Sequence, residues 1–291
     1  MRASHAQSGH GQQVGEIIDI KRYPLAEPGS ERWMSAVAEA RRSLLRSGCA
    51  VLPGFVPAGR LAALRAECAS LAGHAFDEER QVNVYNTHPD QDLPEDHPAR
   101  HVMLRGNAFV ARDNIPEHFI VQRLYDSEPF QRFLAECLGR DRVHPYADPL
   151  AGLVVNIVRP GREHPWHFDT NEYAVSMITQ APESGGAFEY VPGIRTTGSE
   201  NFPAVAAVLR GEGGDLVHAL PLRPGDLQIF LGRYSMHRVC AVRGNRARYS
   251  AIFSYTDRPG VIGNPERTRQ LFGRTTAVHE GPARRPDELI D

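Results

Sequence analysis

The first half of the chain carries apolar residues at helical spacing. In residues 31–46, Trp33, Val37 and Ala40 recur every three to four positions, which is typical of an amphipathic helix. The same criterion predicts helices at 58–71 and 128–137, with a short strand at 49–52 between the first two.

Two polar stretches lie outside this pattern. Residues 1–15 are polar, contain glycine and show no periodicity, so we expect them to be disordered. The stretch 87–100 is rich in proline, aspartate and histidine, and its composition predicts a long surface loop.

The second half changes to short runs of β-branched and aromatic residues, separated by turns such as Pro160-Gly161 and Pro224-Gly225. Many short strands without intervening helices predict an antiparallel sandwich or barrel, and hence a protein that is mainly β with α. The expected strands are 153–158, 173–180, 187–191, 226–231, 238–242 and 248–255, followed by a helix at 265–274.

Composition limits the possible partners. The chain has 291 residues and is 41% hydrophobic, which is enough for a sizeable core. Its formal net charge of −2, without a local cluster of Lys and Arg, argues against a nucleic-acid partner. No run approaches the roughly 18 apolar residues of a transmembrane helix, so we expect no membrane partner. The first twenty residues lack the apolar segment of a signal peptide.

Two residue types exclude further chemistry. Lys21 is the single lysine and follows no glycine-rich loop, which argues against Schiff-base enzymes and P-loop nucleotidases. The cysteines are scattered singly among apolar neighbours, which predicts buried, reduced thiols in a cytoplasmic protein rather than a zinc or redox site. They are Cys49, Cys68, Cys137 and Cys240.

The sharpest local motif is the H-x-D tripeptide formed by His167 and Asp169. On a strand, residues i and i+2 point to the same face, with backbones about 7 Å apart, so both side chains can reach one ion. A third ligand from a distant strand would complete a facial triad with open positions for substrate and oxygen.

Two histidines qualify as the third ligand. His218 precedes a predicted strand, whereas His237 follows a turn and a strand that would return the chain to the same end of a barrel. We therefore prefer His237. A rival H-x-D at His88 and Asp90 has a central proline, which argues against a strand there.

Arg248 is the fourth residue of interest. It lies eleven residues after His237, at the start of the last predicted strand. A guanidinium inside a small barrel is costly unless a carboxylate pairs with it, and its planar fork suits a bidentate partner. An H-x-D, a distant histidine and a strand arginine are together far more specific than any one alone.

Three segments carry a resemblance to a known family. Residues 166–180, 185–192 and 224–238 resemble the iron(II)/2-oxoglutarate-dependent oxygenases, most closely the carrier-independent amino-acid halogenases and their hydroxylating relatives. The resemblance is strong over about 148–260 and weaker upstream.

The resemblance implies a fold and a set of cofactors. The fold is a double-stranded β-helix (a jelly roll, as in cupins) with an N-terminal helical layer. Residues 16–291 would form a single domain, and the cofactors would be Fe(II), 2-oxoglutarate and O2. By the same resemblance, His167, Asp169 and His237 match the iron ligands, and Arg248 matches the residue that binds the distal carboxylate of 2-oxoglutarate. The expected parts of the domain are a helical part at 16–147, a β-helix core at 148–258 and a C-terminal tail at 259–291.

One departure from the halogenases bears on the reaction. Those enzymes have a small residue, usually glycine, at the position of Asp169, and the lost carboxylate leaves a coordination position for chloride. Because Asp169 is retained here, we expect hydroxylation rather than halogenation. Desaturation and ring formation stay open, since they depend on how the substrate is placed.

The same resemblance suggests substrate-binding residues. His164 matches a substrate-contacting histidine by its spacing from His167, and Arg105 falls near an upstream arginine that holds the substrate carboxylate. Glu172 could meet a cationic group. Phe272 stands where the relatives have a larger aromatic residue, which argues against direct transfer of their substrate.

The leading hypothesis is thus a cytoplasmic dioxygenase that hydroxylates a free amino acid or a related small polar metabolite, releasing succinate and CO2. A cupin-like metal protein, such as an isomerase or a small-ligand binder, is the alternative, and a halogenase is a lesser one. Arg248 distinguishes the dioxygenase from the cupin-like metal protein, because a protein that does not bind 2-oxoglutarate has no need of this arginine. The sequence leaves the oligomeric state open.

Overall fold

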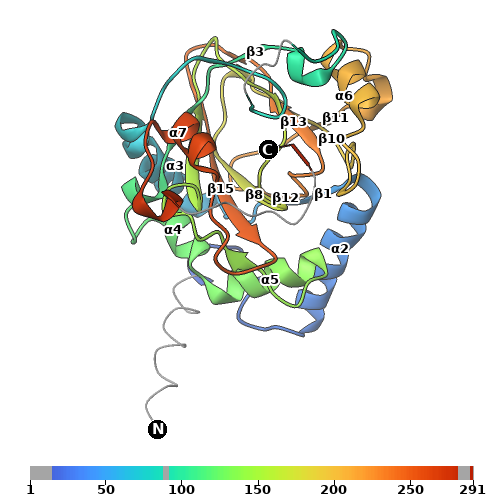
Figure 1. The fold of residues 1–291 in the computed structure, drawn as a ribbon. Coiled ribbons are helices and arrows are strands. Elements are labelled where there is room, and N and C mark those ends of the chain that lie inside the picture. Colours follow the sequence, from blue (N-terminus) through green and yellow to red (C-terminus); the bar gives the residue numbers. More distant parts are fainter. Residues whose placement is uncertain (1–14, 88–91, 281–288, 291) are drawn as a thin grey trace.

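Two antiparallel β-sheets form the centre of the computed structural model, which describes residues 15–87, 92–280 and 289–290 (Figure 1). The larger sheet contains, in spatial order, β1 (Cys49–Leu52), β12 (Leu227–Phe230), β8 (Tyr173–Gln180), β15 (Arg248–Thr256), β6 (Leu153–Val158) and β4 (Ala108–Val110), with β5 (His144–Pro145) paired to β15. The smaller sheet contains β11 (His218–Leu220), β10 (Phe188–Val191), β13 (Met236–Val239) and β7 (His164–His167). Two antiparallel sheets that line one cavity form the jelly roll predicted from the sequence.

The side chains of strand β15 alternate between the two faces of the larger sheet. Its even-numbered side chains, including Ser250 and Ile252, line a cavity between the sheets. Its odd-numbered side chains, such as Phe253, are buried in the hydrophobic core on the other side. This alternation follows from the two-residue period of a strand.

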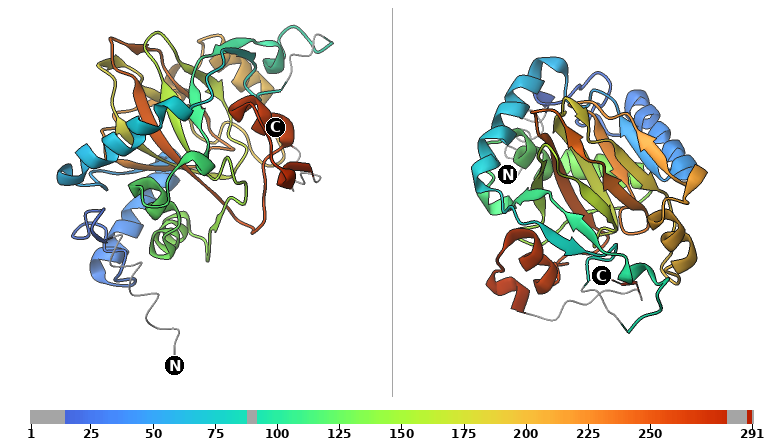
Figure 2. Two further views of the ribbon diagram at one scale, coloured as in Figure 1. Left: turned by 90° about the vertical axis from the view of Figure 1, so that its left-hand side faces the viewer. Right: turned by 90° about the horizontal axis from the view of Figure 1, so that it is seen from above.

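A layer of helices covers the outer face of the larger sheet (Figure 2). In this layer Trp33 packs edge-on against Phe133, with ring centroids 5.1 Å apart, and Phe130 contacts Phe253 of the sheet. Each fully buried aromatic side chain contributes about 1.5–3 kcal/mol by removal from water. The helices are α2 (Glu31–Ser47), α3 (Ala58–Ser70), α4 (Ile120–Tyr125) and α5 (Glu128–Leu138).

The C-terminal helix α7 (Pro265–Phe272) lies at an edge of the cavity instead. Asn264 caps its N-terminus by accepting a hydrogen bond from the backbone N–H of Glu266, and Gly273 ends it with a φ of 69°. The ring of Phe272 contacts that of Phe109 on β4, with centroids 6.3 Å apart, which fixes the helix against the larger sheet.

Short elements complete the described chain. They are α6 (Phe202–Leu209), the strand pairs β2 (Arg80–Val82) with β3 (Met103–Arg105) and β9 (Ser184–Gly185) with β14 (Val242–Arg243), and 3-10 helices at Leu71–His74, Pro98–Arg100, Arg112–Asn114, Gly214–Leu216 and Ala277–Glu280. None of the helices in the described ranges is long and apolar enough to cross a membrane.

The predicted helices and long strands agree with the structure to within a few residues, and β6 and β8 have the predicted bounds. The prediction of disorder at 1–15 falls almost entirely on residues outside the described ranges, and so does the rival motif at His88 and Asp90. The strand predicted at 238–242 is wrong in register, because β13 begins at Met236 and a separate short strand begins at Val242.

Candidate active site

Three side chains from the predicted motif converge at the cavity. His167 at the end of β7 lies directly opposite His237 on β13 in the smaller sheet. The Nε2 atoms of these histidines lie 3.9 Å and 3.5 Å from Oδ1 of Asp169. Ligands at about 2.0–2.2 Å from one ion lie roughly 3–4 Å from each other, so this triad could hold a divalent metal.

Backbone carbonyl groups orient both imidazole rings. Nδ1 of His167 lies 2.8 Å from the carbonyl oxygen of Pro165, and Nδ1 of His237 lies 2.9 Å from that of Ser235. A carbonyl oxygen can only accept a hydrogen bond, so Nδ1 carries the proton in each ring. The lone pairs of the two Nε2 atoms are therefore available to a metal.

Local electrostatics favour the protonation states that bind metal. Burial, reinforced by His164 and His237, lowers the pKa of His167 well below its usual value, so its ring stays neutral at neutral pH. Burial by itself would raise the pKa of Asp169, but the neighbouring His237 and His167 bring it below its ordinary value. Neutral imidazoles and an ionised carboxylate are the forms that coordinate a cation.

The position of Asp169 differs from the expected one. The strand β7 ends at His167, so Asp169 lies in the following loop rather than on the same strand face. Its backbone N–H donates a hydrogen bond of 3.2 Å to the carbonyl oxygen of Gly232, in the loop before β13. A Cβ atom at residue 232 would overlap the Asp169 carboxylate, so glycine is required for this approach.

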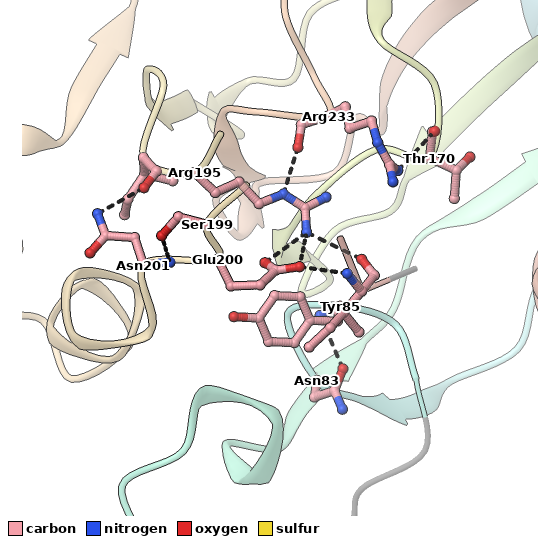
Figure 3. A network of polar contacts seen from close by, with 10 residues as sticks. Asn83, Tyr85, Thr170, Arg195, Ser199, Glu200, Asn201 and Arg233 are labelled. Atoms are coloured by element: carbon pink, nitrogen blue, oxygen red, sulfur yellow. Dashed lines mark hydrogen bonds and ion pairs between the residues drawn. The ribbon is translucent and has the colours of Figure 1, made fainter. Parts of the chain in front are cut away.

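A buried network of polar side chains packs against the loop that contains Asp169 (Figure 3). The guanidinium of Arg195 is paired with Glu200, at 3.0 Å, and donates to the backbone carbonyl of Arg233, at 2.7 Å. It also lies 3.8 Å from the ring centroid of Phe168, the residue between His167 and Asp169. Arg233 in turn donates to the backbone carbonyl of Thr170, at 3.2 Å. The network thus packs against the H-x-D segment and bonds to the residue that follows it.

Arg248 lies in the same cavity as the triad. It is 3% exposed, and one of its guanidinium N–H groups donates to Oγ of Ser250 at 3.1 Å. Among the described residues no carboxylate pairs with it and its Nε has no hydrogen-bond partner, while burial lowers its pKa to about 10. A buried, uncompensated guanidinium fits an anionic ligand.

Comparison with known proteins agrees with this geometry. The family model described as Halogenase D matches residues 33–261, which is most of the chain and includes the triad and Arg248. The chain belongs to the Halogenase D family. No curated protein matches its sequence. The predicted resemblance to iron(II)/2-oxoglutarate oxygenases is confirmed.

Solved structures share the fold of this Halogenase D family member. A 2OG-Fe(II) oxygenase-family oxidoreductase from Burkholderia pseudomallei is 16% identical, with 76% of this chain and 91% of that chain covered and a TM-score of 0.50. A prolyl hydroxylase from Trichoplax adhaerens, in complex with a hypoxia-inducible-factor peptide, is 13% identical (86% and 99% covered, TM-score 0.53). The epimerase SnoN, in complex with Fe3+, α-ketoglutarate and nogalamycin RO, is 17% identical (77% and 84% covered, TM-score 0.54). At these identities the likeness shows the jelly-roll fold alone.

The three expected substrate residues have different positions. His164 lines the cavity, stacks on the His167 ring at 3.7 Å between centroids, and has no hydrogen-bond partner on Nε2 in the described structure. Arg105 is buried behind α7, where it donates to the carbonyl of Gln270 at 2.7 Å. Glu172 is half-buried and is not among the described residues that line the cavity. Only His164 is therefore brought to the triad.

Sequence reasoning missed several residues of this Halogenase D family site. Gly232 and Arg195 act from loops, and Arg267 reaches the cavity from α7. Of the two candidate third ligands, the structure brings His237 to His167 and Asp169. His218 is exposed on β11 and lies outside the triad. Pro224-Gly225 was a usable signal for the turn before β12, but no local pattern marks Gly232 or Arg267.

Proposed function

We propose that the protein is an Fe(II)/2-oxoglutarate-dependent dioxygenase that hydroxylates a C–H bond of a free amino acid or a related small polar metabolite. The observation that carries this proposal is one cavity that contains both the triad of His167, Asp169 and His237 and the uncompensated Arg248. A metal site alone would suit many proteins, whereas a buried cation beside it calls for an anionic co-substrate.

The donor set fits the cofactors of the family. Two neutral imidazoles and a carboxylate would hold the iron, and Arg248, supported by Ser250, would hold the distal carboxylate of 2-oxoglutarate. When bound, iron with 2-oxoglutarate and O2 supplies the oxidation and the loss of CO2 that leaves succinate. The aromatic rings of Phe188 and Phe230 pack against His237 and keep water from that side of the site.

For the substrate, His164 and Arg105 are the candidate contacts. Nε2 of His164 and the Nε and Nη1 atoms of Arg105 are buried and have no hydrogen-bond partner among the described residues. Burial first, and the charge of Arg105 second, lower the pKa of His164 well below its usual value. Of these two residues His164 is the one that lines the cavity, and its buried, unsatisfied Nε2 beside the triad favours a polar substrate group such as the carboxylate of a free amino acid.

Halogenation is the second candidate because of the family to which the chain belongs. Asp169 argues against it, since a carboxylate that occupies a coordination position leaves none for chloride at that point. A cupin-like metal protein without oxygenase activity would leave the buried charge of Arg248 without a purpose. Chloride-dependent product mass would favour the halogenase.

An anaerobic visible-absorption titration tests the proposal. Fe(II) and 2-oxoglutarate are added to the apoprotein, followed by a panel of free amino acids. We expect a charge-transfer band that requires both additions and that shifts with an amino acid. A band that no amino acid perturbs would keep the oxygenase and reject the amino-acid substrate. Bound metal without a band would support the cupin-like alternative.

A further inference from the structure

Helix α7 and the chain just before it supply one wall of the cavity. The lining residues from this segment are Gly263, Arg267, Thr268, Leu271 and Phe272. The helix has 8 residues, whereas an isolated helix shorter than about 12–15 residues is only marginally stable in water. Contacts with the rest of the fold must therefore fix the position of this wall.

One buried carboxylate holds the chain on both sides of α7. Asp148 is 0% exposed, and its Oδ2 accepts a hydrogen bond from the backbone N–H of Gly263, at 3.2 Å, before the helix. The same oxygen lies 2.9 Å from Nε2 of His279, after the helix. Oδ1 of Asp148 accepts from the backbone N–H groups of Leu150 and Ala151, at 2.8 Å and 2.9 Å. The loop between β5 and β6 therefore fixes the carboxylate to which both flanks of α7 are bonded.

The ring of His279 is oriented to donate to this carboxylate. Its Nδ1 accepts a hydrogen bond from the backbone N–H of Thr276 at 3.1 Å, so Nε2 carries the proton that Asp148 accepts. The side chains of His279 and Asp148 are 1% and 0% exposed. A hydrogen bond to a buried carboxylate is stronger than an exposed one, and losing it leaves a buried acceptor unsatisfied.

Close packing at Gly263 reinforces the first of these contacts. A Cβ atom at residue 263 would lie 2.7 Å from Oδ2 of Asp148 and 2.9 Å from Oγ1 of Thr268 on α7. The backbone N–H of Ala147 also donates to the carbonyl oxygen of Val261 at 2.9 Å. The start of the helix thus lies directly against the segment that contains Asp148.

Helix α7 contacts both candidate substrate residues. Arg105 donates to the carbonyl oxygen of Gln270 on the helix at 2.7 Å. The ring of Phe272 contacts that of Phe109 at 6.3 Å, and Phe109 packs edge-on against His164 at 5.9 Å. A displacement of α7 would therefore change the surroundings of both His164 and Arg105.

We propose that Asp148 and His279 are positioning residues that hold α7 as the substrate-side wall of the cavity. The inference rests on the proposed function, because the candidate contacts His164 and Arg105 define the substrate side. Neither Asp148 nor His279 is among the described residues that line the cavity, so the pair acts through the helix. Arg248 lies on β15, and the triad belongs to β7, β13 and the loop after β7. Binding of metal and 2-oxoglutarate is therefore independent of this pair.

The variant His279→Phe tests whether the pair holds the helix, because it keeps an aromatic ring and removes the N–H donor. Hydrogen–deuterium exchange, measured by mass spectrometry, compares peptides from α7 and β15 in the variant and the wild type. We expect exchange in α7 to become at least about 10-fold faster while β15 is unchanged, since the lost hydrogen bond favours local opening. Unchanged exchange in α7, or equal acceleration in both elements, would overturn the proposal.

The anaerobic charge-transfer titration tests the effect on the cavity. In His279→Phe we expect the 2-oxoglutarate concentration that gives half of the band to stay within about twofold of the wild type. The apparent Kd of the amino acid that shifts the band in the wild type should rise roughly 10-fold. An unchanged Kd for the amino acid, or a loss confined to 2-oxoglutarate, would overturn the proposal. Absence of the band in the wild type would reject the proposed function, and exchange in α7 would still decide whether the pair holds the helix.

Two further variants distinguish positioning from general stability. His279→Gln retains an N–H donor and should recover most of the wild-type exchange and amino-acid binding. Trp33→Phe removes the hydrogen bond from the indole Nε1 to Glu136, at 2.8 Å in the helical layer, and is the matched control. It should lower the urea midpoint but leave α7 exchange and amino-acid binding unchanged. If Trp33→Phe weakens amino-acid binding as much as His279→Phe does, the effect is a general loss of stability and the proposal is wrong.

Discussion

The carboxylate of Asp169 lies directly against Gly232, so closely that a Cβ atom at residue 232 would overlap it. The two residues are also joined through the backbone, because Asp169 N–H donates to the Gly232 carbonyl. Asp169 lies beyond the end of β7, and its position therefore depends on this loop-to-loop contact.

Gly232→Ala should consequently impair metal binding without changing any ligand. The added methyl group must displace the Asp169 carboxylate from the two histidines, and we expect metal affinity to fall roughly 10- to 100-fold. Titration with Co(II), followed by its visible absorption, measures this. Gly198→Ala is the control, since a Cβ there meets nothing within 4 Å. Equal affinities in the two variants would contradict the positioning role of Gly232.

Removal of a proposed ligand should abolish turnover. His237→Ala deletes one of the three donors, and we expect succinate formation to drop by more than about 100-fold, a greater loss than removing a supporting group would cause. His218→Ala removes the competing histidine, which is exposed on β11, and should retain wild-type activity. A large loss in His218→Ala with activity retained in His237→Ala would reverse the assignment.

Arg248→Gln should weaken the binding of 2-oxoglutarate specifically. It removes a buried charge that the described protein does not compensate, and the loss of charge-assisted hydrogen bonds is expected to raise the apparent KM for 2-oxoglutarate roughly 10- to 100-fold. Metal affinity, measured with Co(II), should change little. The exposed Arg243 provides a control as Arg243→Gln. The assignment fails if both variants have the same KM.

The sequence predicted the parts of the fold that have a clear period. The strands at 153–158 and 173–180 are six and eight residues long, are rich in β-branched and other apolar residues and are buried over most of their length, so their bounds could be found. Strands of three residues, such as β3 and β4, offer too few positions for any periodicity. Several strands in the first half of the chain were missed for this reason.

In the candidate site, too, the sequence predicts only what a local pattern marks. His167 and Asp169 are neighbours in sequence and could be paired by spacing, although the strand geometry assumed for them was wrong. Gly232 and Arg267 matter only because distant segments meet, and nothing local marks them. Arg105 was found by family resemblance, yet its side chain lies behind α7 rather than on the cavity wall.

The side chains of Arg195 and Glu200 form a buried ion pair and are 1% and 10% exposed. Arg195→Met leaves Glu200 as an unpaired buried charge, and we expect the free energy of unfolding to fall by about 3–5 kcal/mol, as measured by urea denaturation. Glu200→Gln keeps hydrogen-bonding capacity and should cost less. Because Arg195 packs on Phe168 within the H-x-D segment, Arg195→Met should also weaken Co(II) binding under conditions in which it remains folded.

The exposed ion pair of Arg210 and Glu212 is the control for this experiment. Solvent screens such a pair, so Arg210→Met should leave both the urea midpoint and Co(II) affinity at their wild-type values. If Arg195→Met lowers stability but not Co(II) affinity, the network is structural only, and the H-x-D segment holds its position without it. If both quantities fall together, the network also positions the metal-binding loop.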